Sequence, residues 1–165
     1  NYVVQDGAGG IPVAIHLAEH FIRNEKFIVV LGDNVAIGDI RKEIEVFKKG
    51  SKGAKIFLKK VPNPEHFGVV EVKNNKIVSM EEKPKVPKSD TIMIGVYMLD
   101  HKAWTYIPTL KPSARGELEI PELMNVYREH DDLDFAYFNG YWIDAGSSFA
   151  HLYEANKYAH EHDKK

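Results

Sequence analysis

Short apolar runs alternate along this chain with segments in which apolar residues recur every three or four positions. Residues 27–31 are wholly apolar, which indicates a strand buried on both faces of a sheet covered by helices. Residues 54–61 and 92–99 predict two further strands. Because strands that alternate with helices form a sheet between helical layers, the pattern predicts an α/β sandwich with buried parallel-type strands.

The remaining elements can be placed from periodicity and turn residues. Helices are predicted over 11–22, after Asp39 as a capping residue, over about 117–130, and from about 147 onward. Asn74 and Asn75 stand between strands 69–72 and 77–80 and predict a hairpin, because asparagine tolerates left-handed backbone. Segment 83–89 is expected to be an ordered loop, and short aromatic strands are expected at 135–137 and 141–143.

The composition excludes several classes of protein. A chain of 165 residues is expected to form one domain, 1–165. Its 22 Lys and Arg against 24 Asp and Glu give a net charge of −2, so neither nucleic acid nor a membrane is expected as a partner. The absence of cysteine excludes disulfides and fits a cytoplasmic location. No leader peptide is visible, and because the chain opens at Asn1 inside an apolar-rich stretch, we expect it to begin within a larger sequence.

One motif has the spacing of a metalloprotease. His16, Glu19 and His20 form an H-x-x-E-H pattern, in which two imidazoles could hold zinc while the carboxylate activates water. The same side chains, with Arg23, also form the polar stripe opposite the apolar positions of the predicted helix. A solvated helix face explains them fully, and we favour that interpretation.

A glycine-rich segment, residues 7–10, precedes the first predicted helix. Its backbone could cradle an anion at the free N–H groups of the helix. A tight loop explains it equally well, because neither a P-loop nor a dinucleotide fingerprint is completed. The glycines also allow the backbone to approach a flat ligand closely.

Two acidic residues follow predicted strands directly. Asp33 comes after the run 27–31, and Asp144 follows a short strand before the last helix. Carboxylates at the end of a strand lie where α/β folds bind ligands, and they are good Mg²⁺ ligands. A turn for Asp33 and a helix cap for Asp144 are the alternatives. We expect the two carboxylates to converge on one Mg²⁺.

Charged residues cluster at two more positions. Glu82 and Lys83 stand where a strand ends, and Arg115 comes just before a helix. A carboxylate can accept hydrogen bonds from sugar hydroxyls, and a lysine can meet a phosphate as a point charge. A solvated charge cluster and an ordinary helix start are the alternatives.

Taken in order, seven segments resemble the sugar-1-phosphate nucleotidylyltransferases, and most of all the glucose-1-phosphate thymidylyltransferase group. The resemblance covers nearly the whole chain. It rests on Gln5 with Gly9-Gly10, and on residues 31–34, 64–70, 81–84, 95–97, 112–120 and 142–146.

The resemblance implies a Rossmann-like mixed sheet sandwiched by helices, and transfer of a nucleotidyl group from a nucleoside triphosphate to a sugar 1-phosphate with release of pyrophosphate. It implies that Asp33 and Asp144 hold Mg²⁺. It further implies catalytic contacts to the sugar phosphate from Lys83 and Arg115. The implied substrate-binding residues are Gln5 and Gly10 at a pyrimidine base, and Asn34, Gly68, Glu82 and Tyr97 in the ligand pocket.

The chain also departs from the family pattern. The opening loop G-G-x-G-T-R-L and its following Pro-Lys segment, which hold the triphosphate, are absent from these residues, so we expect the fold to be incomplete at its amino-terminal end. Ile94 replaces a small polar residue, which leaves the sugar open, and Pro121 stands where the family often has threonine. Transfer from UTP rather than dTTP, and a non-catalytic sugar-phosphate binding module, remain alternatives. A homo-oligomer or a separate amino-terminal piece is the expected partner.

Overall fold

The computed structural model describes residues 1–162. Its main feature is a six-stranded sheet in the order β5-β4-β6-β3-β7, with β1 also paired to β6. Residue Ile92 of β6 pairs with β4, whereas its last four residues pair with β1, so β4 and β1 share one edge of this central strand. The strands are β1 (Phe27–Val30), β3 (Ala54–Lys60), β4 (Gly68–Lys73), β5 (Lys76–Glu82), β6 (Thr91–Leu99) and β7 (Leu133–Tyr137).

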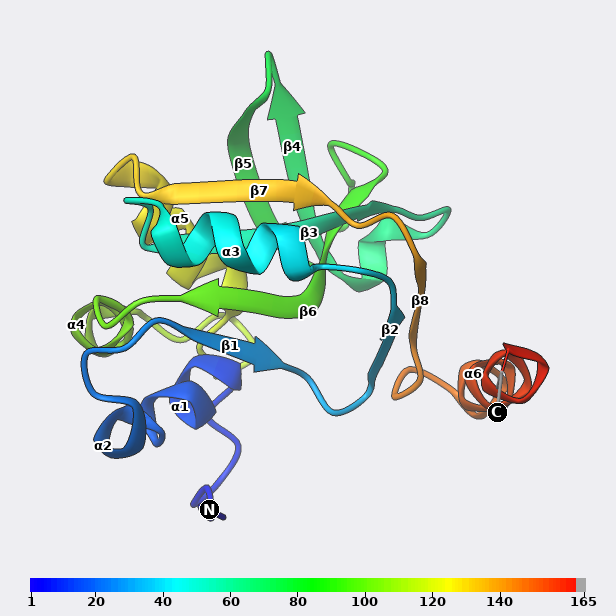
Figure 1. The fold of residues 1–165 in the computed structure, drawn as a ribbon, viewed down its shortest axis with the longest axis horizontal. Coiled ribbons are helices and arrows are strands. Elements are labelled where there is room, and N and C mark those ends of the chain that lie inside the picture. Colours follow the sequence, from blue (N-terminus) through cyan, green and yellow to red (C-terminus); the bar gives the residue numbers. More distant parts are fainter. Residues whose placement is uncertain (163–165) are drawn as a thin grey trace.

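Two shorter strands form a second sheet beside the first. β2 (Asn34–Ile37) pairs antiparallel with β8 (Tyr141–Asp144). Figure 1 shows this ribbon at one end of the main sheet, between the sheet and the last helix. The ribbon therefore joins the turn after β1 to the carboxyl-terminal part of the chain.

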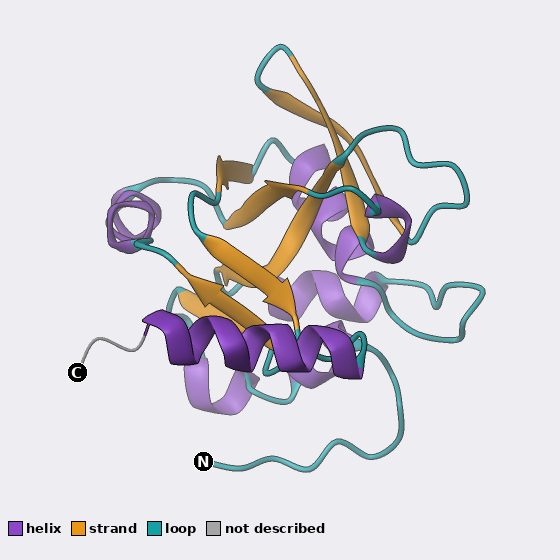
Figure 2. Ribbon diagram, turned by 90° about the vertical axis from the view of Figure 1, so that its right-hand side faces the viewer, coloured by secondary structure: helices purple, strands orange, loops and turns teal. Residues whose placement is uncertain are grey.

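Helices lie on both faces of the main sheet (Figures 1 and 2). On the face of the sheet that α3 covers, Phe47 packs with the even-numbered apolar residues of β6. On the opposite face, the odd-numbered Met93, Tyr97 and Leu99 pack with α1, α4 and α5. This alternation follows the two-residue period of a strand. The helices are α1 (Ile11–His16), α2 (Glu19–Ile22), α3 (Arg41–Lys49), α4 (Ala103–Tyr106), α5 (Ile120–Glu129) and α6 (Phe149–His162), with 3-10 turns η1 (Pro64–His66) and η2 (Ile107–Thr109).

The predicted α/β sandwich is confirmed, but the predicted parallel pairing is wrong for most of the sheet. Only β3 and β7 are parallel, and every other described pair is antiparallel. The expectation for β1 is also wrong, because Ile28 is 41% and Val30 60% exposed. Ile28 and Val30 stand opposite Met98 and Val96 in the register, so they share the face of the sheet on which α3 packs. The helix lies over the inner strands and covers β1 only in part (Figure 1).

Other boundaries differ by a few residues. The helix predicted over 11–22 is interrupted at Leu17 and Ala18, and the helix predicted from 117 begins at Ile120 because Glu119 is extended, with φ −101° and ψ 144°. The hairpin at Asn74 and Asn75 is confirmed, with φ of 50° and 57°.

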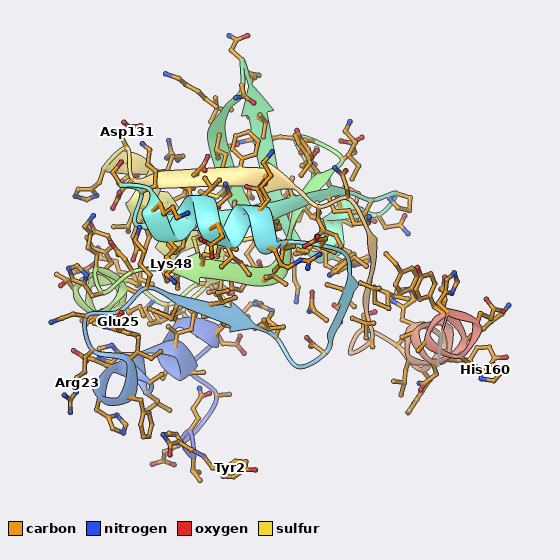
Figure 3. The ribbon with its side chains drawn as sticks, viewed as in Figure 1. Tyr2, Arg23, Glu25, Lys48, Asp131 and His160 are labelled. Carbon is orange, nitrogen blue, oxygen red and sulfur yellow. The ribbon has the colours of Figure 1, made fainter. Side chains whose placement is uncertain are left out.

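The surface of the described chain carries charged side chains and also several exposed apolar ones, such as Val86 and Phe149. Figure 3 shows the labelled Tyr2, Asp131 and His160 at the periphery of the described chain. Helix α6 stands beside the body and packs on β8, where the rings of Tyr141 and Tyr158 stack. Within residues 1–162, no helix combines the length and the apolar character that crossing a bilayer requires.

Candidate active site

A pocket of about 260 Å³ opens where the β1–β2 turn, the β4–β5 ends, β6, β8 and the loop before α5 meet. It gathers residues far apart in the sequence onto one edge of the sheet, as expected for an α/β ligand site. Eight of the ten predicted site residues line it: Asp33, Asn34, Gly68, Glu82, Lys83, Tyr97, Arg115 and Asp144.

The other two predicted residues, Gln5 and Gly10, line a wider neighbouring groove of about 690 Å³. Ile11, Leu31 and Glu117 line both spaces, so the groove adjoins the pocket. An extended ligand could therefore place one end in the groove and the other in the pocket.

The two residues predicted to hold Mg²⁺ are backbone neighbours at the end of the β2–β8 ribbon, and both line the pocket. Asn34 lies opposite Asp144 in the register, and the backbone N–H of Ala145 donates to the carbonyl of Asp33 at 2.8 Å. A Cβ on Gly146 would lie 2.8 Å from Oδ2 of Asp33, so glycine leaves room for this carboxylate. In the described chain no third His, Cys, Asp or Glu completes a closed ligand set. Two carboxylates with open positions fit Mg²⁺, which usually keeps waters and substrate phosphates in its shell.

Asn34 holds the carboxylate of Asp33. Its Oδ1 accepts hydrogen bonds from the backbone N–H of Gly95 at 2.9 Å and from Nε1 of Trp142 at 2.7 Å. Because these two donors fix the oxygen, the amide nitrogen must face the other way, where it donates to Oδ1 of Asp33 at 2.9 Å. A Cβ on Gly95 would lie 2.6 Å from the Asn34 amide carbon, so this contact requires glycine.

Gly68, Glu82 and Tyr97 line the other half of the pocket. Gly68 pairs with Glu82 across β4 and β5, and a Cβ at this glycine would lie 3.3 Å from Oε2 of Glu82 and 3.2 Å from Pro121. Tyr97 is only 4% exposed. Burial and the nearby charges of Glu82 and Asp33 raise the pKa of Tyr97 well above its usual range, so its hydroxyl stays protonated.

Lys83 and Arg115 bring the positive charge. Lys83 directly follows β5 in left-handed backbone, with φ 45°, and its N–H donates to the carbonyl of Phe67 at 3.0 Å. Such strain in a non-glycine residue is characteristic of functional sites. The Nζ of Lys83 lies 3.9 Å from Glu82, and Nη2 of Arg115 lies 3.8 Å from the same carboxylate.

Two glutamates of this cluster have opposite pKa shifts. Burial raises the pKa of Glu82, and the charge of Glu119 adds to the rise. For Glu119, burial also acts upward, but hydrogen bonds from Arg115 and Ser113 outweigh it and lower the pKa. Glu119 is therefore the ionised partner of Arg115, while Glu82 keeps its proton more readily.

Sequence reasoning assigned no role to Glu117, Glu119 or Trp142, which all line the pocket. The two glutamates stand two and four positions after Arg115, and this spacing could have indicated that they pair with it. Trp142 gave none, because its partner Asn34 is 108 positions away.

The H-x-x-E-H motif and the glycine-rich segment 7–10 have structural explanations. The H-x-x-E-H residues are divided between α1 and α2, with Nε2 of His16 3.8 Å from Glu19, and within residues 1–162 they belong to no cluster of three possible ligands. Gly10 has φ 91°, and a Cβ there would lie 2.1 Å from the carbonyl oxygen of Leu118. This glycine is needed for contact between two backbone segments.

A pocket that gathers side chains from several elements at one edge of the sheet is typical of an α/β protein that binds a ligand there. The family model described as nucleotidyl transferase matches residues 1–162, and the chain belongs to this family.

Among curated relatives, the chain is 40% identical over 151 residues to a glucose-1-phosphate thymidylyltransferase of Neisseria meningitidis, a match covering 89% of this chain and 52% of the relative. The chain thus spans about half the length of that relative. A crystal structure from Bacillus anthracis, provisionally named a glucose-1-phosphate thymidylyltransferase and containing a sucrose, superposes with a TM-score of 0.92 and 44% identity, over 100% of this chain and 67% of the other. A UDP-glucose pyrophosphorylase complexed with UDP-glucose shares the fold, with a TM-score of 0.84 and 23% identity, over 98% of this chain and 66% of the other.

Proposed function

We propose that this chain forms the sugar-phosphate and metal half of a sugar-1-phosphate nucleotidyltransferase, with glucose 1-phosphate and dTTP as substrates. The observation that carries the proposal is the single pocket shared by Asp33, Asp144, Glu82, Lys83 and Arg115. The names of the meningococcal and Bacillus relatives support the choice of substrates.

The proposed reaction needs no protein nucleophile. A phosphate oxygen of the sugar 1-phosphate attacks the α-phosphorus of the triphosphate, a new P–O bond forms, and the bond to the β-phosphate breaks to release pyrophosphate. Lys83 and Arg115 hold the sugar phosphate, and Glu82 accepts hydrogen bonds from sugar hydroxyls. Asp33 and Asp144 would hold Mg²⁺, which neutralises phosphate charge when bound. Positioning and charge neutralisation supply most of the catalysis in such reactions.

The base is proposed to lie in the groove beside Gln5 and Gly10. Both residues could read uracil as well as thymine, so UTP is the second candidate substrate. Calorimetric titration with dTDP-glucose and UDP-glucose distinguishes the two. We expect tighter binding of the thymidine nucleotide, and the reverse order would assign the chain to uridylyl transfer.

Turnover by the 165-residue chain alone is expected to be very low. Its residues contain no G-G-x-G-T-R-L loop to hold the leaving phosphates, and losing even one anion-stabilising donor typically costs about 3–4 kcal/mol of barrier. The measurement is pyrophosphate release from dTTP and glucose 1-phosphate with Mg²⁺, first with the chain alone and then with the family's loop segment added as a peptide. Ligand binding without turnover in both cases would instead favour a non-catalytic binding module.

Glu82→Gln is expected to weaken glucose 1-phosphate binding by about 1–3 kcal/mol, because a charge-assisted hydrogen bond becomes a neutral one. Calorimetric titration measures this loss. The exposed neighbour Glu81 alternates to the other face of β5, so Glu81→Gln is the matched control and should bind normally. Equal affinity of both variants would remove Glu82 from the site.

The same substitution should stabilise the fold at neutral pH. Because burial raises the pKa of Glu82, the folded chain keeps a proton that the unfolded chain loses near pH 4.5. The wild type therefore loses stability as pH rises from about 4.5 toward the raised folded pKa. Glutamine cannot ionise, so the variant should avoid that loss, which urea unfolding at pH 4 and pH 7 would measure.

A further inference from the structure

One edge of the Arg115 guanidinium is bound to Glu119. Its Nε donates to Oε1 of Glu119 at 3.1 Å, and its Nη2 donates to Oε1 at 3.0 Å and to Oε2 at 2.9 Å. This pairing of two nitrogens with one carboxylate fixes the plane of the guanidinium as well as its place. A single ion pair would leave the plane free to turn.

Glu119 is itself held in place. Its side chain is only 8% exposed, and the hydroxyl of Ser113 donates to its Oε1 at 2.6 Å. The same hydroxyl accepts the backbone N–H of Arg115 at 3.1 Å. Ser113, Arg115 and Glu119 therefore form one closed network at the start of α5.

The opposite edge of the guanidinium remains available. Within residues 1–162, Nη1 of Arg115 has no hydrogen bond or ion pair, and the two other nearby carboxylates, Glu82 and Glu117, lie 3.8 Å and 3.7 Å from Nη2. The side chain is 44% exposed and lines the pocket. A guanidinium carries donors on both of its edges, so binding one edge to Glu119 leaves Nη1 for an anion.

We propose that Glu119 is a positioning residue that holds Arg115 so that Nη1 meets the phosphate of the sugar 1-phosphate. This inference rests on the proposed function of the pocket. A purely stabilising pair has no need to stand beside Glu82 and Glu117. In the ion pairs of residues 1–162, Arg115 lies near all three carboxylates, and Lys83 lies near Glu82. Placement beside a substrate phosphate explains why the arginine is held there.

The test is Glu119→Gln in the full 165-residue chain, titrated with glucose 1-phosphate. Glutamine keeps the size of the side chain and an acceptor for Ser113, but it loses the charge and one of the two acceptor oxygens. We expect binding to weaken at least tenfold. Glu122→Gln, at an exposed position in the first turn of α5, is the matched control and should bind like the wild type.

A double-mutant cycle separates positioning from general stability. Lysine at position 115 cannot use the two-nitrogen pairing, so adding Glu119→Gln to Arg115→Lys should weaken binding less than twofold further. If Glu119→Gln weakened glucose 1-phosphate binding as much in the Arg115→Lys variant as in the wild type, the inference would be overturned. So would a Glu119→Gln variant that melts earlier but binds glucose 1-phosphate as the wild type does.

A gentler variant guards against misfolding of Glu119→Gln. Ser113→Ala removes one of the bonds that fix Glu119 and should weaken binding two- to threefold, and unchanged binding would count against the network. If the wild type fails to bind glucose 1-phosphate, the proposed function falls together with the inference. If the wild type binds and the Glu119 variant binds equally well, only the inference falls.

Discussion

Gly10→Ala is expected to lower the free energy of unfolding by about 3 kcal/mol or more, in the range of the most damaging single substitutions. The new Cβ would lie 2.1 Å from the carbonyl oxygen and 2.9 Å from the nitrogen of Leu118. Both are backbone atoms, so no side-chain rotation can relieve the contact. The backbone hydrogen bond from Leu118 to Gly9, 3.0 Å long, would have to stretch or break.

Urea unfolding of Gly10→Ala against Gly7→Ala isolates this contact. Gly7 has a similar φ of 81°, but a Cβ there meets nothing within 4 Å. Its substitution should therefore show only the cost of left-handed backbone, about 1–2 kcal/mol. Equal destabilisation of the two variants would mean that residues 7–10 and the segment before α5 do not pack as described.

Asp33→Asn is expected to abolish the gain in dTTP affinity that Mg²⁺ provides, a loss of at least about 100-fold. Replacing partners outside the ligand shell already costs about 10–100-fold in metal affinity, and a direct ligand should cost more. Asp144→Asn should have the same effect, because both carboxylates lie in one pocket. Calorimetric titration of dTTP with and without Mg²⁺ measures the gain.

A matched control for the metal prediction lies six residues away. Asp39 is exposed, and its Oδ2 pairs with Nη2 of Arg41 at 2.7 Å, outside the pocket. Asp39→Asn should leave the Mg²⁺-dependent gain intact. If the Asp33 variant also kept the gain, the metal would have to be held by other residues.

Local sequence patterns predicted the helices and strands well, but they predicted poorly which elements pack or pair with one another. The hairpin at Asn74 and Asn75 followed from turn chemistry, and β6 is buried on both faces as its composition suggested. The equally apolar run 27–31 misled, because composition does not tell a central strand from one that a helix only partly covers. Strand direction was misjudged for a similar reason: apolar runs record burial, and they do not record which way a neighbour runs.

Site residues at the ends of strands could be predicted from the sequence. Site residues that act by binding and positioning another side chain could not. Asp33, Glu82 and Asp144 could be chosen because a carboxylate at the end of a strand points to ligand chemistry. Glu119 resembled part of an ordinary helix start, and only the fold shows it bound to Arg115. Its role depends on distances and angles that sequence spacing does not contain.

The central position of β6 sets the order in which the described strands can pair during synthesis. Among the described strands, β1, β2 and β3 all lie within the first 60 residues, yet none pairs with another: β1 and β3 require β6, and β2 requires β8. Within residues 1–162, β3 pairs only with strands that follow it in the sequence, β6 and β7, whereas the β4–β5 hairpin closes locally. Synthesis that pauses before β6 leaves the apolar side chains of β3 without this neighbour, and such exposed strands are prone to aggregation.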